Sequence, residues 1–290
     1  MADLKFNKLY FLGPEGTYAE KAMKLLVKMF NIEAGEIIPK NPVTKILQTV
    51  DNENDSAAVL PIENSIEGIV RETIDNMIVL KDNSLKITAE TIIPISHCLV
   101  SVSDDIINIK TVLSHSQALD QCSGFISKNL PDVQIISVPS TAYAAQFAKE
   151  HGSEYAAIAS ETSAEKFGLN ILARNVNDEK DNKTRFILLS RTELKPEKQN
   201  KTSIFFSVKN EPGTLFNVLK IFNEYNINLL YIESRPSKKL LGEYNFCVDI
   251  DGHKSDKNIL SAVSDIKKIT NSLKITGSYP KFTNNTVTIS

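Results

Sequence analysis

Short apolar runs alternate with helical patterns along the first 190 residues, and this alternation constrains the fold more than any other feature of the sequence. Residues 8–13 and 56–62 are apolar runs of strand length, whereas the apolar side chains of residues 17–30 recur at helical spacing. The remaining predicted elements are a helix at 65–80 and strands at 97–102, 110–114, 134–139, 155–160 and 185–191. Such alternation indicates an α/β fold with mostly parallel sheets.

A polar, charged segment at residues 191–203 divides the chain and predicts a linker between two domains. We expect these domains to span residues 1–192 and 200–282. The second reads strand–helix–strand–strand–helix–strand, which is the order of a ferredoxin-like unit. One sheet face of such a unit stays bare, so we expect it to pair with a copy of itself in a homodimer or homotetramer.

Charge and cysteine usage exclude several classes of protein. The 33 basic and 35 acidic residues give a net charge of −2, which does not indicate a nucleic-acid partner. Three widely spaced cysteines argue against a disulfide framework or a structural zinc site. No run approaches the ~18 apolar residues of a membrane span, and the first residues lack a signal-peptide pattern, so we expect a cytoplasmic protein without a membrane partner.

Several predicted strands end directly on a helix-capping signal. Thr17 precedes Glu20 by three residues, and the same spacing relates Asn64 to Glu67 and Ser114 to Gln117. Ser140 and Thr141 open another predicted helix, which Gly152 can close. Helix N-termini at the carboxyl ends of strands bind anions well, so these junctions suggest a small anionic ligand. Plain helix capping explains the same pattern.

Taken together and in order, the motifs resemble those of prephenate dehydratases. They are GPEGTY (13–18), LPIENSIEG (60–68), LSHSQALDQC (113–122), PSTAYAA (139–145), AAIASETSAEKFGLNIL (156–172) and DNKTRF (181–186). The segment EPGTLFNVLKIFNEYNINLLYIESRP (211–236) resembles the phenylalanine-binding ACT domain attached to those enzymes. The resemblance implies a two-lobed catalytic domain like a periplasmic binding protein, with one lobe at residues 1–80 and 180–192 and the other at residues 90–178.

The activity implied is conversion of the dianion prephenate to phenylpyruvate with loss of water and CO2, without a cofactor or a metal. Two alternatives remain open. An arogenate dehydratase would share the fold, and a small-anion or amino-acid receptor would share the α/β junctions without catalysing a reaction.

The resemblance also assigns candidate catalytic residues. Thr184 of the TRF triplet is implied to assist departure of the ring hydroxyl. Arg185 is expected to hold the pyruvyl carboxylate with its two-pronged guanidinium. His115 is a candidate for orienting the substrate or donating a proton, and Glu63 is an alternative proton donor if burial raises its pKa.

The remaining implied residues fall into two groups. Those expected to contact the substrate are Gly16, Thr17, Asn64, Ser65, Gln117, Ser140, Thr141, Asn182 and Phe186. Those expected to bind L-phenylalanine as an effector are Gly213, Thr214, Leu215, Asn228, Leu229, Glu233, Ser234 and Arg235.

Overall fold

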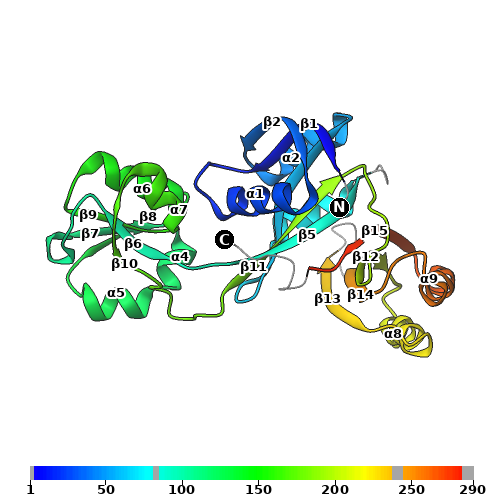
Figure 1. Cartoon of the computed structure of the whole chain (residues 1–290). Helices are drawn as coiled ribbons and strands as arrows, with labels where there is room; N and C mark the ends of the chain where they lie inside the picture. Colours follow the sequence, from blue (N-terminus) through cyan, green and yellow to red (C-terminus); the bar gives the residue numbers. More distant parts are fainter. Residues whose placement is uncertain (1–2, 81–84, 237–243, 283–290) are drawn as a thin grey trace.

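The computed structural model describes residues 3–80, 85–236 and 244–282, which form two lobes and a C-terminal unit (Figure 1). The chain runs through the first lobe, crosses to the second, and returns to the first before it enters the C-terminal unit. None of the helices in this described part has the length and apolar character needed to cross a bilayer.

The first lobe is built on a mixed sheet with the strand order β5-β11-β3-β1-β2. Strand β1 pairs in parallel with β2 and β3, while β11 runs antiparallel to both β3 and β5. The elements of this lobe are β1 (Lys5–Leu12), α1 (Tyr18–Phe30), β2 (Glu33–Lys40), α2 (Val43–Asn52), β3 (Ser56–Asn64), β4 (Gly68–Ile69), α3 (Arg71–Val79), β5 (Lys86–Pro94) and β11 (Lys183–Ser190).

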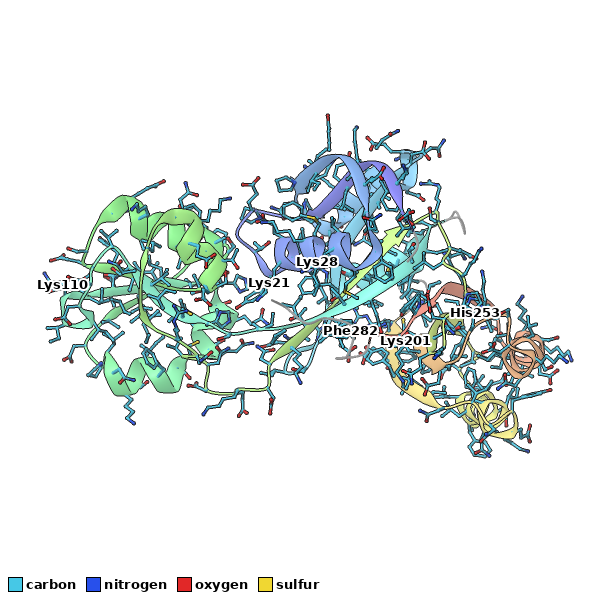
Figure 2. All side chains as sticks on the ribbon, in the orientation of Figure 1. Lys21, Lys28, Lys110, Lys201, His253 and Phe282 are labelled. Atoms are coloured by element: carbon cyan, nitrogen blue, oxygen red, sulfur yellow. The ribbon has the colours of Figure 1, made fainter. Side chains whose placement is uncertain are left out.

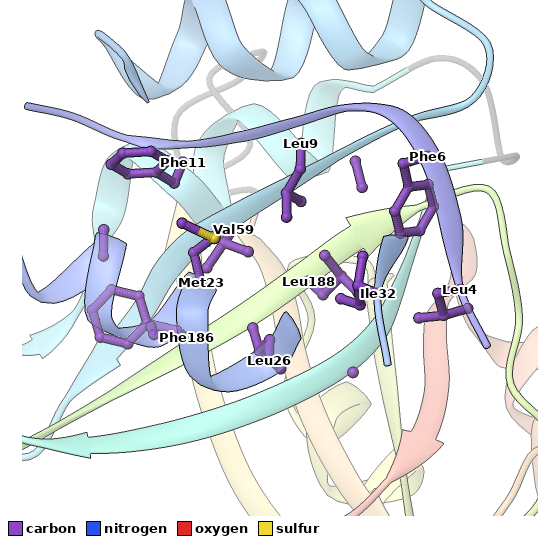
Figure 3. Packing of buried hydrophobic residues seen from close by; sticks show 14 of the residues in the cluster. Leu4, Phe6, Leu9, Phe11, Met23, Leu26, Ile32, Val59, Phe186 and Leu188 are labelled. Carbon is purple, nitrogen blue, oxygen red and sulfur yellow. The ribbon is translucent and has the colours of Figure 1, made fainter. Parts of the chain in front are cut away.

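Helices cover both faces of this sheet. On one face Met23 and Leu26 of α1 pack against apolar side chains of the strands, among them Val59 and Leu188 (Figure 3). On the other face α2 and α3 form a second core, which also takes in Tyr279 and two further side chains of the C-terminal unit. Because side chains alternate along a strand, β11 contributes to both cores.

The second lobe carries its own five-stranded sheet, in the order β10-β6-β9-β7-β8. Strand β7 pairs in parallel with β8 and β9, and β6 runs antiparallel to β9 and β10. The elements are β6 (Cys98–Ser101), a 3-10 turn (Ile106–Asn108), β7 (Thr111–Ser114), α4 (Ser116–Asp120), α5 (Ser123–Asn129), β8 (Gln134–Ser137), α6 (Thr141–His151), β9 (Tyr155–Ala159), α7 (Glu161–Phe167) and β10 (Asn170–Ala173). Two separate sheets confirm the expected two-lobed fold.

Two chain segments cross between the lobes, at residues 95–97 and 174–182, and hydrogen bonds join them. The backbone N–H of Val176 donates to the carbonyl of His97 at 2.9 Å, and the Ser96 hydroxyl donates to Asn175 at 2.7 Å. The hydroxyl of Tyr18, the first residue of α1, accepts from the Ser96 N–H at 3.0 Å and donates to the Ser96 carbonyl. The two crossings therefore form one hinge anchored on the first lobe.

The C-terminal unit has the expected βαββαβ order, and its sheet continues that of the first lobe. The elements are β12 (Asn200–Ser207), α8 (Thr214–Glu224), β13 (Leu229–Pro236), β14 (Tyr244–Asp251), α9 (Lys257–Ile269) and β15 (Ser272–Pro280). Strand β15 pairs in parallel with β5 at Gly277 and Ile87. A Cβ at residue 277 would lie 2.4 Å from the Ile87 carbonyl oxygen, so glycine permits this close approach.

Three expectations about local structure are corrected. The helix predicted at 65–80 begins only at Arg71, because the Asn64 carboxamide accepts from the N–H groups of Ile66 and Glu67 and forms a turn that leads into β4. Strand β5 was not expected, and it crosses the anticipated lobe boundary at residue 90 into the first sheet.

The predicted linker at 191–203 is shorter than expected. Strand β12 already begins at Asn200. The Arg191 guanidinium donates to the Val50, Asp51 and Glu53 carbonyls at the C-terminal end of α2, at 2.7–3.0 Å. A cation at this end of a helix is favourable, so Arg191 ties the start of the linker to the first lobe.

Candidate active site

Thr184 and Asn64 lie opposite each other on the paired strands β11 and β3, at the end of the sheet next to the hinge. The Asn64 amide Nδ2 donates to Thr184 Oγ1 at 2.9 Å and to the Asn182 side-chain oxygen at 2.7 Å. All three side chains are buried. The Thr184 oxygen is thus an acceptor for Asn64, and no acceptor for its proton is found among the described residues. This hydroxyl is therefore a donor available to a ligand.

The same hydrogen-bond network reaches the second lobe through Gln121, the residue that ends α4. The Asn182 amide donates to Gln121 Oε1 at 3.0 Å, and Gln121 Nε2 donates to Glu67 Oε1 at 3.2 Å. Gln121 was not among the expected site residues. The sequence offered one signal for this role, because Gln121 lies inside the motif at residues 113–122. Helix-capping rules do not single it out from the other residues of that motif.

The loop before α1 is closed against the second lobe. The Thr17 hydroxyl accepts from the Glu20 N–H at 3.4 Å, and the Glu20 carboxylate accepts from the Gly16 N–H at 2.6 Å, so the predicted capping pair is confirmed. The Gly16 carbonyl accepts from the hydroxyls of Ser160 and Ser163 at 3.2 and 2.8 Å. These serines lie at the start of α7, and their bonds hold the loop and the second lobe together.

Two further helices of the second lobe begin at expected site residues. Ser140 caps α6 by accepting from the Tyr143 N–H at 3.0 Å, and Thr141 is its first residue. The predicted cap by Ser114 is wrong, because its hydroxyl donates to the Ile158 carbonyl at 2.6 Å and α4 begins after His115. Figure 1 shows α4 and α7 on the side of this lobe that faces α1.

The half-buried side chains of His115 and Gln117 form no hydrogen bond to any described residue, which leaves their polar atoms available to a ligand. No three His, Cys, Asp or Glu side chains within residues 3–80, 85–236 and 244–282 are grouped as a metal site would require.

Arg185 and Glu63 do not face this site, which corrects their expected roles. Arg185 follows Thr184 directly in β11, so its side chain emerges from the opposite face of the sheet. Its guanidinium donates to Glu90, Asp249 and Glu63. The pairing register of β3 shifts between Pro61 and Glu63, and this bulge brings Glu63 onto the Arg185 side of the sheet.

Two other expected substrate contacts have structural roles. Phe186 is buried in the core that α1 covers, beside Met23 and Val59, where Figure 3 shows its ring. The Ser65 hydroxyl accepts from the Lys183 N–H at 2.9 Å and donates to the Asp181 carbonyl at 3.2 Å. Ser65 therefore fixes the turn after Asn64 to the start of β11.

Comparison with known families supplies the deciding observation. A family model described as prephenate dehydratase matches residues 9–194, which include the whole Thr184–Asn64–Asn182–Gln121 network. The chain belongs to the prephenate dehydratase family. A model of the ACT domain matches residues 202–268, so the C-terminal unit is an ACT domain.

Prephenate dehydratases from distant organisms align over almost the whole chain. The chain is 42% identical over 274 residues to a bifunctional chorismate mutase/prephenate dehydratase of Aquifex aeolicus, a match that covers 94% of this chain and 74% of that protein. It is 41% identical over 273 residues to a prephenate dehydratase of Methanocaldococcus jannaschii, covering 93% and 96%. The crystal structure of an Arthrobacter aurescens prephenate dehydratase in complex with L-Phe superposes with a TM-score of 0.85 at 34% identity, covering 94% and 90%.

The expected effector residues of this chain lie at both ends of α8 and along β13. Gly213 precedes α8 with a φ of +85°, and a Cβ there would meet no atom within 4 Å. The Thr214 hydroxyl donates to the Lys209 carbonyl at 2.9 Å, within the same loop. Leu215 and Leu229 pack on the ACT core, and Glu233 and Ser234 lie within β13. Asn228 lies beyond the C-terminal end of α8, where its amide donates to Asp251 at 3.1 Å.

Arg235 departs from the effector role expected for it. Its guanidinium forms a bidentate ion pair with Asp75 of α3, with N–O distances of 3.0 and 3.1 Å. The ACT strand β13 is thereby attached to the catalytic domain.

Proposed function

We propose that this chain is a prephenate dehydratase, which converts prephenate to phenylpyruvate, CO2 and water. Membership of the family supports the reaction. The single structural observation that carries it is the Thr184 hydroxyl, whose oxygen is held by Asn64 at 2.9 Å while its proton has no acceptor among the described residues.

The reaction requires one proton and the movement of an electron pair from the breaking C–C bond into the ring. The C–C bond to the ring carboxylate breaks, its electron pair enters the ring, the C–O bond to the ring hydroxyl breaks, and the ring becomes aromatic. Hydroxide is a poor leaving group, so the departing oxygen must receive a hydrogen bond or a proton. Thr184 supplies the hydrogen bond, and the oxygen leaves as water with one proton taken up from the surroundings.

The two carboxylates of prephenate must bind groups other than Arg185, because its guanidinium is already paired with protein side chains. Thr17, His115 and Ser140 open α1, α4 and α6, and the backbone N–H groups of the first turn of a helix suit an anion. His115, Gln117 and Thr141 add side-chain donors at two of these termini. We assign them to the pyruvyl end of the substrate, because tight binding of the ring carboxylate would stabilise the charge that must be lost.

Turnover of two related substrates tests this function. The full chain is incubated with prephenate or with arogenate, which carries an amino group in place of the keto group, and the aromatic product is followed by absorbance. We expect phenylpyruvate from prephenate at a rate that Thr184→Ala greatly reduces. Faster turnover of arogenate would make the chain an arogenate dehydratase, and binding without turnover of either substrate would make it a receptor.

L-Phenylalanine is the effector that we propose for the ACT domain. The ACT family match and the L-Phe complex of the similar Arthrobacter aurescens enzyme support this assignment. Strand β13 ends the order of the large sheet, with Ile232 exposed on it. We therefore propose that two copies associate along this edge in a homodimer, or in a homotetramer built from such dimers. Analytical ultracentrifugation, with and without phenylalanine, measures whether the chain forms a dimer or a tetramer.

A further inference from the structure

Arg185 and its partners form a buried ion cluster where the catalytic domain meets the ACT domain. We infer that Arg185 is a positioning residue through which the ACT domain controls the placement of Thr184. This inference rests on the proposed function, because it concerns the dehydratase reaction and its inhibition by phenylalanine.

All three nitrogens of the Arg185 guanidinium are engaged. Nε donates to Glu90 at 2.7 Å, Nη1 donates to Asp249 at 2.6 Å and to Glu63 at 3.3 Å, and Nη2 donates to the Tyr279 hydroxyl at 2.8 Å. Only 7% of the Arg185 surface is exposed. A substrate carboxylate would have to displace one of these partners, so the side chain is committed to the protein.

The partners of Arg185 come from both domains. Glu90 lies on β5 and Glu63 on β3 of the catalytic domain, whereas Asp249 lies on β14 and Tyr279 on β15 of the ACT domain. The ACT domain also contributes Lys201 of β12, whose ammonium donates to Glu90 at 2.9 Å and lies 4.0 Å from Asp249. We call Arg185, Lys201, Glu63, Glu90 and Asp249 the interdomain ion cluster.

The C-terminal segment after β15 also contacts this cluster. The backbone N–H of Phe282 donates to the second oxygen of Glu90 at 3.1 Å. Figure 2 shows Lys201 and Phe282 side by side where the catalytic strands meet the ACT domain. Both oxygens of Glu90 are therefore occupied, one by the cations and one by the backbone.

A buried cluster of this kind resists gradual distortion. Burial disfavours the charged guanidinium, but Tyr279 and the three surrounding acidic groups raise the pKa of Arg185 well above its ordinary value. Removing a buried ion from its partner leaves an uncompensated charge, so the groups move together or remain in place. A shift of β12 or β14 within the ACT domain must therefore be followed by Arg185.

The backbone converts that movement into a change at the active site. Thr184 and Arg185 share a peptide bond, and their Cα atoms are about 3.8 Å apart. Glu63, the neighbour of Asn64 in β3, is the most distant and most exposed partner of Arg185, and Asn64 itself is held by its turn with Ile66 and Glu67. Movement of Arg185 toward or away from Asp249 therefore tilts Thr184 relative to Asn64. A displacement of about 1 Å at a reacting group can lower a rate by about 100-fold. A movement of the ACT domain can thus lower the rate at the active site through the Arg185–Thr184 peptide bond.

The test changes the ACT side of the cluster and leaves the catalytic side intact. In the full chain, Asp249→Asn removes one carboxylate that faces Arg185. We expect kcat to fall by about 10- to 100-fold, with KM changed by less than about twofold. Saturating phenylalanine should lower turnover by the unmodified enzyme by about 10- to 100-fold, as misplacement of Thr184 would, and turnover by the variant by less than about twofold. Titration calorimetry should show that the variant still binds phenylalanine.

Asp265→Asn is the matched control. Asp265 is an ACT carboxylate that pairs with Lys268 on the same helix, away from the catalytic domain. It should preserve kcat and inhibition. If Asp249→Asn lowers only the melting temperature and keeps kcat and inhibition, the cluster is merely structural and the inference is overturned.

Arg185→Lys gives an independent readout. The lysine ammonium is a single point charge and cannot replace the planar guanidinium that binds Glu90, Asp249 and Tyr279 together. We therefore expect a fall in kcat with nearly unchanged KM. A large rise in KM at unchanged kcat would instead make Arg185 a substrate ligand and overturn the inference. Absence of prephenate turnover by the unmodified chain would remove the proposed function as well, whereas normal turnover with unaffected variants would remove this inference alone.

Discussion

Thr184 and Arg185 are consecutive residues of β11, yet their side chains lie on opposite faces of the sheet and in different environments. Thr184 accepts a hydrogen bond from Asn64 beside the hinge, while Arg185 is surrounded by acidic groups of both domains. One peptide unit thus joins the candidate active site to the domain interface. The alternation of side chains along a strand makes this arrangement possible without any intervening element.

Removing the Thr184 hydroxyl should lower turnover far more than substrate affinity. Thr184→Ala deletes the donor proposed for the departing oxygen, and loss of one such bond costs about 10²- to 10³-fold in kcat. Thr184→Ser keeps the hydroxyl and should retain most of the activity. Steady-state kinetics with prephenate measure both variants. Equal, small effects of the alanine variant on kcat and KM would exclude Thr184 from the reaction.

Asn64→Asp should inactivate the enzyme by capturing the Thr184 proton. The carboxylate keeps an oxygen for the Ile66 and Glu67 N–H groups, so the turn can form. The amide that donates to Thr184 becomes an acceptor, and the threonine hydroxyl then donates to it instead of to the substrate. We expect kcat to fall about 100-fold. Asn129→Asp, on the exposed surface of α5, makes the same chemical change elsewhere and should leave kcat unchanged.

The sequence predicts most of the architecture because local signals agree with the tertiary structure. The strand and helix periods place β1, β3, α1 and α6, and Thr17 and Ser140 cap the helices that they were expected to open. Strand β5 was not predicted, because its buried positions include Thr88, Glu90 and Thr91. These polar side chains interrupt the apolar run that marks an interior strand.

Candidate site residues are harder to predict than elements, because a motif does not state which way a side chain points. Both Thr184 and Arg185 were expected to face the substrate, although strand alternation already placed them on opposite sides. The bulge that turns Glu63 toward Arg185 depends on strand pairing, which a single sequence does not display. The role of Gln121 likewise depends on contacts with Asn182 and Glu67, both distant in the chain.

Glu90→Gln should destabilise the protein strongly. Glu90 Oε2 accepts from both Arg185 and Lys201, and its side chain is 1% exposed. Breaking a buried ion pair costs about 3–5 kcal/mol, which corresponds to a melting temperature lower by at least about 6 °C. Glu33→Gln removes the exposed pair with Lys5 and should leave the melting temperature nearly unchanged. Differential scanning calorimetry compares the variants, and equal shifts would contradict the prediction.

Gly213→Val should weaken inhibition by phenylalanine without abolishing dehydration. A side chain at residue 213 meets open space, so the effect is backbone strain at a φ of +85° and not crowding of the loop. A β-branched residue avoids that conformation, and the start of α8 must rearrange. Gly152→Val imposes at least as much strain in the second lobe, at a φ of +95° and a ψ of −167°, and serves as the control. Inhibition curves should shift only for the residue 213 variant.

His97, which lies at the hinge between the lobes, should make the stability of the protein depend on pH. Its side chain is buried with its ring edge-on to Tyr18, and burial lowers its pKa from 6.5 to about 4 despite a hydrogen bond with Gln121. The unfolded chain therefore binds a proton below about pH 6.5, whereas the folded chain does not until about pH 4. Stability from this residue is complete above pH 6.5 and falls as the pH decreases through that window.

Replacing His97 with a group that does not titrate should remove this part of the pH dependence. At pH 5 the linkage amounts to about 2 kcal/mol, or about 4–8 °C in melting temperature. His97→Gln keeps a polar side chain within reach of Gln121, so we expect its melting temperature to fall less than that of the unmodified protein between pH 7.5 and pH 5. The comparison cancels the contribution of carboxylates common to both proteins. Parallel melting curves across this range would show that His97 titrates alike in the folded and unfolded chains, against the prediction.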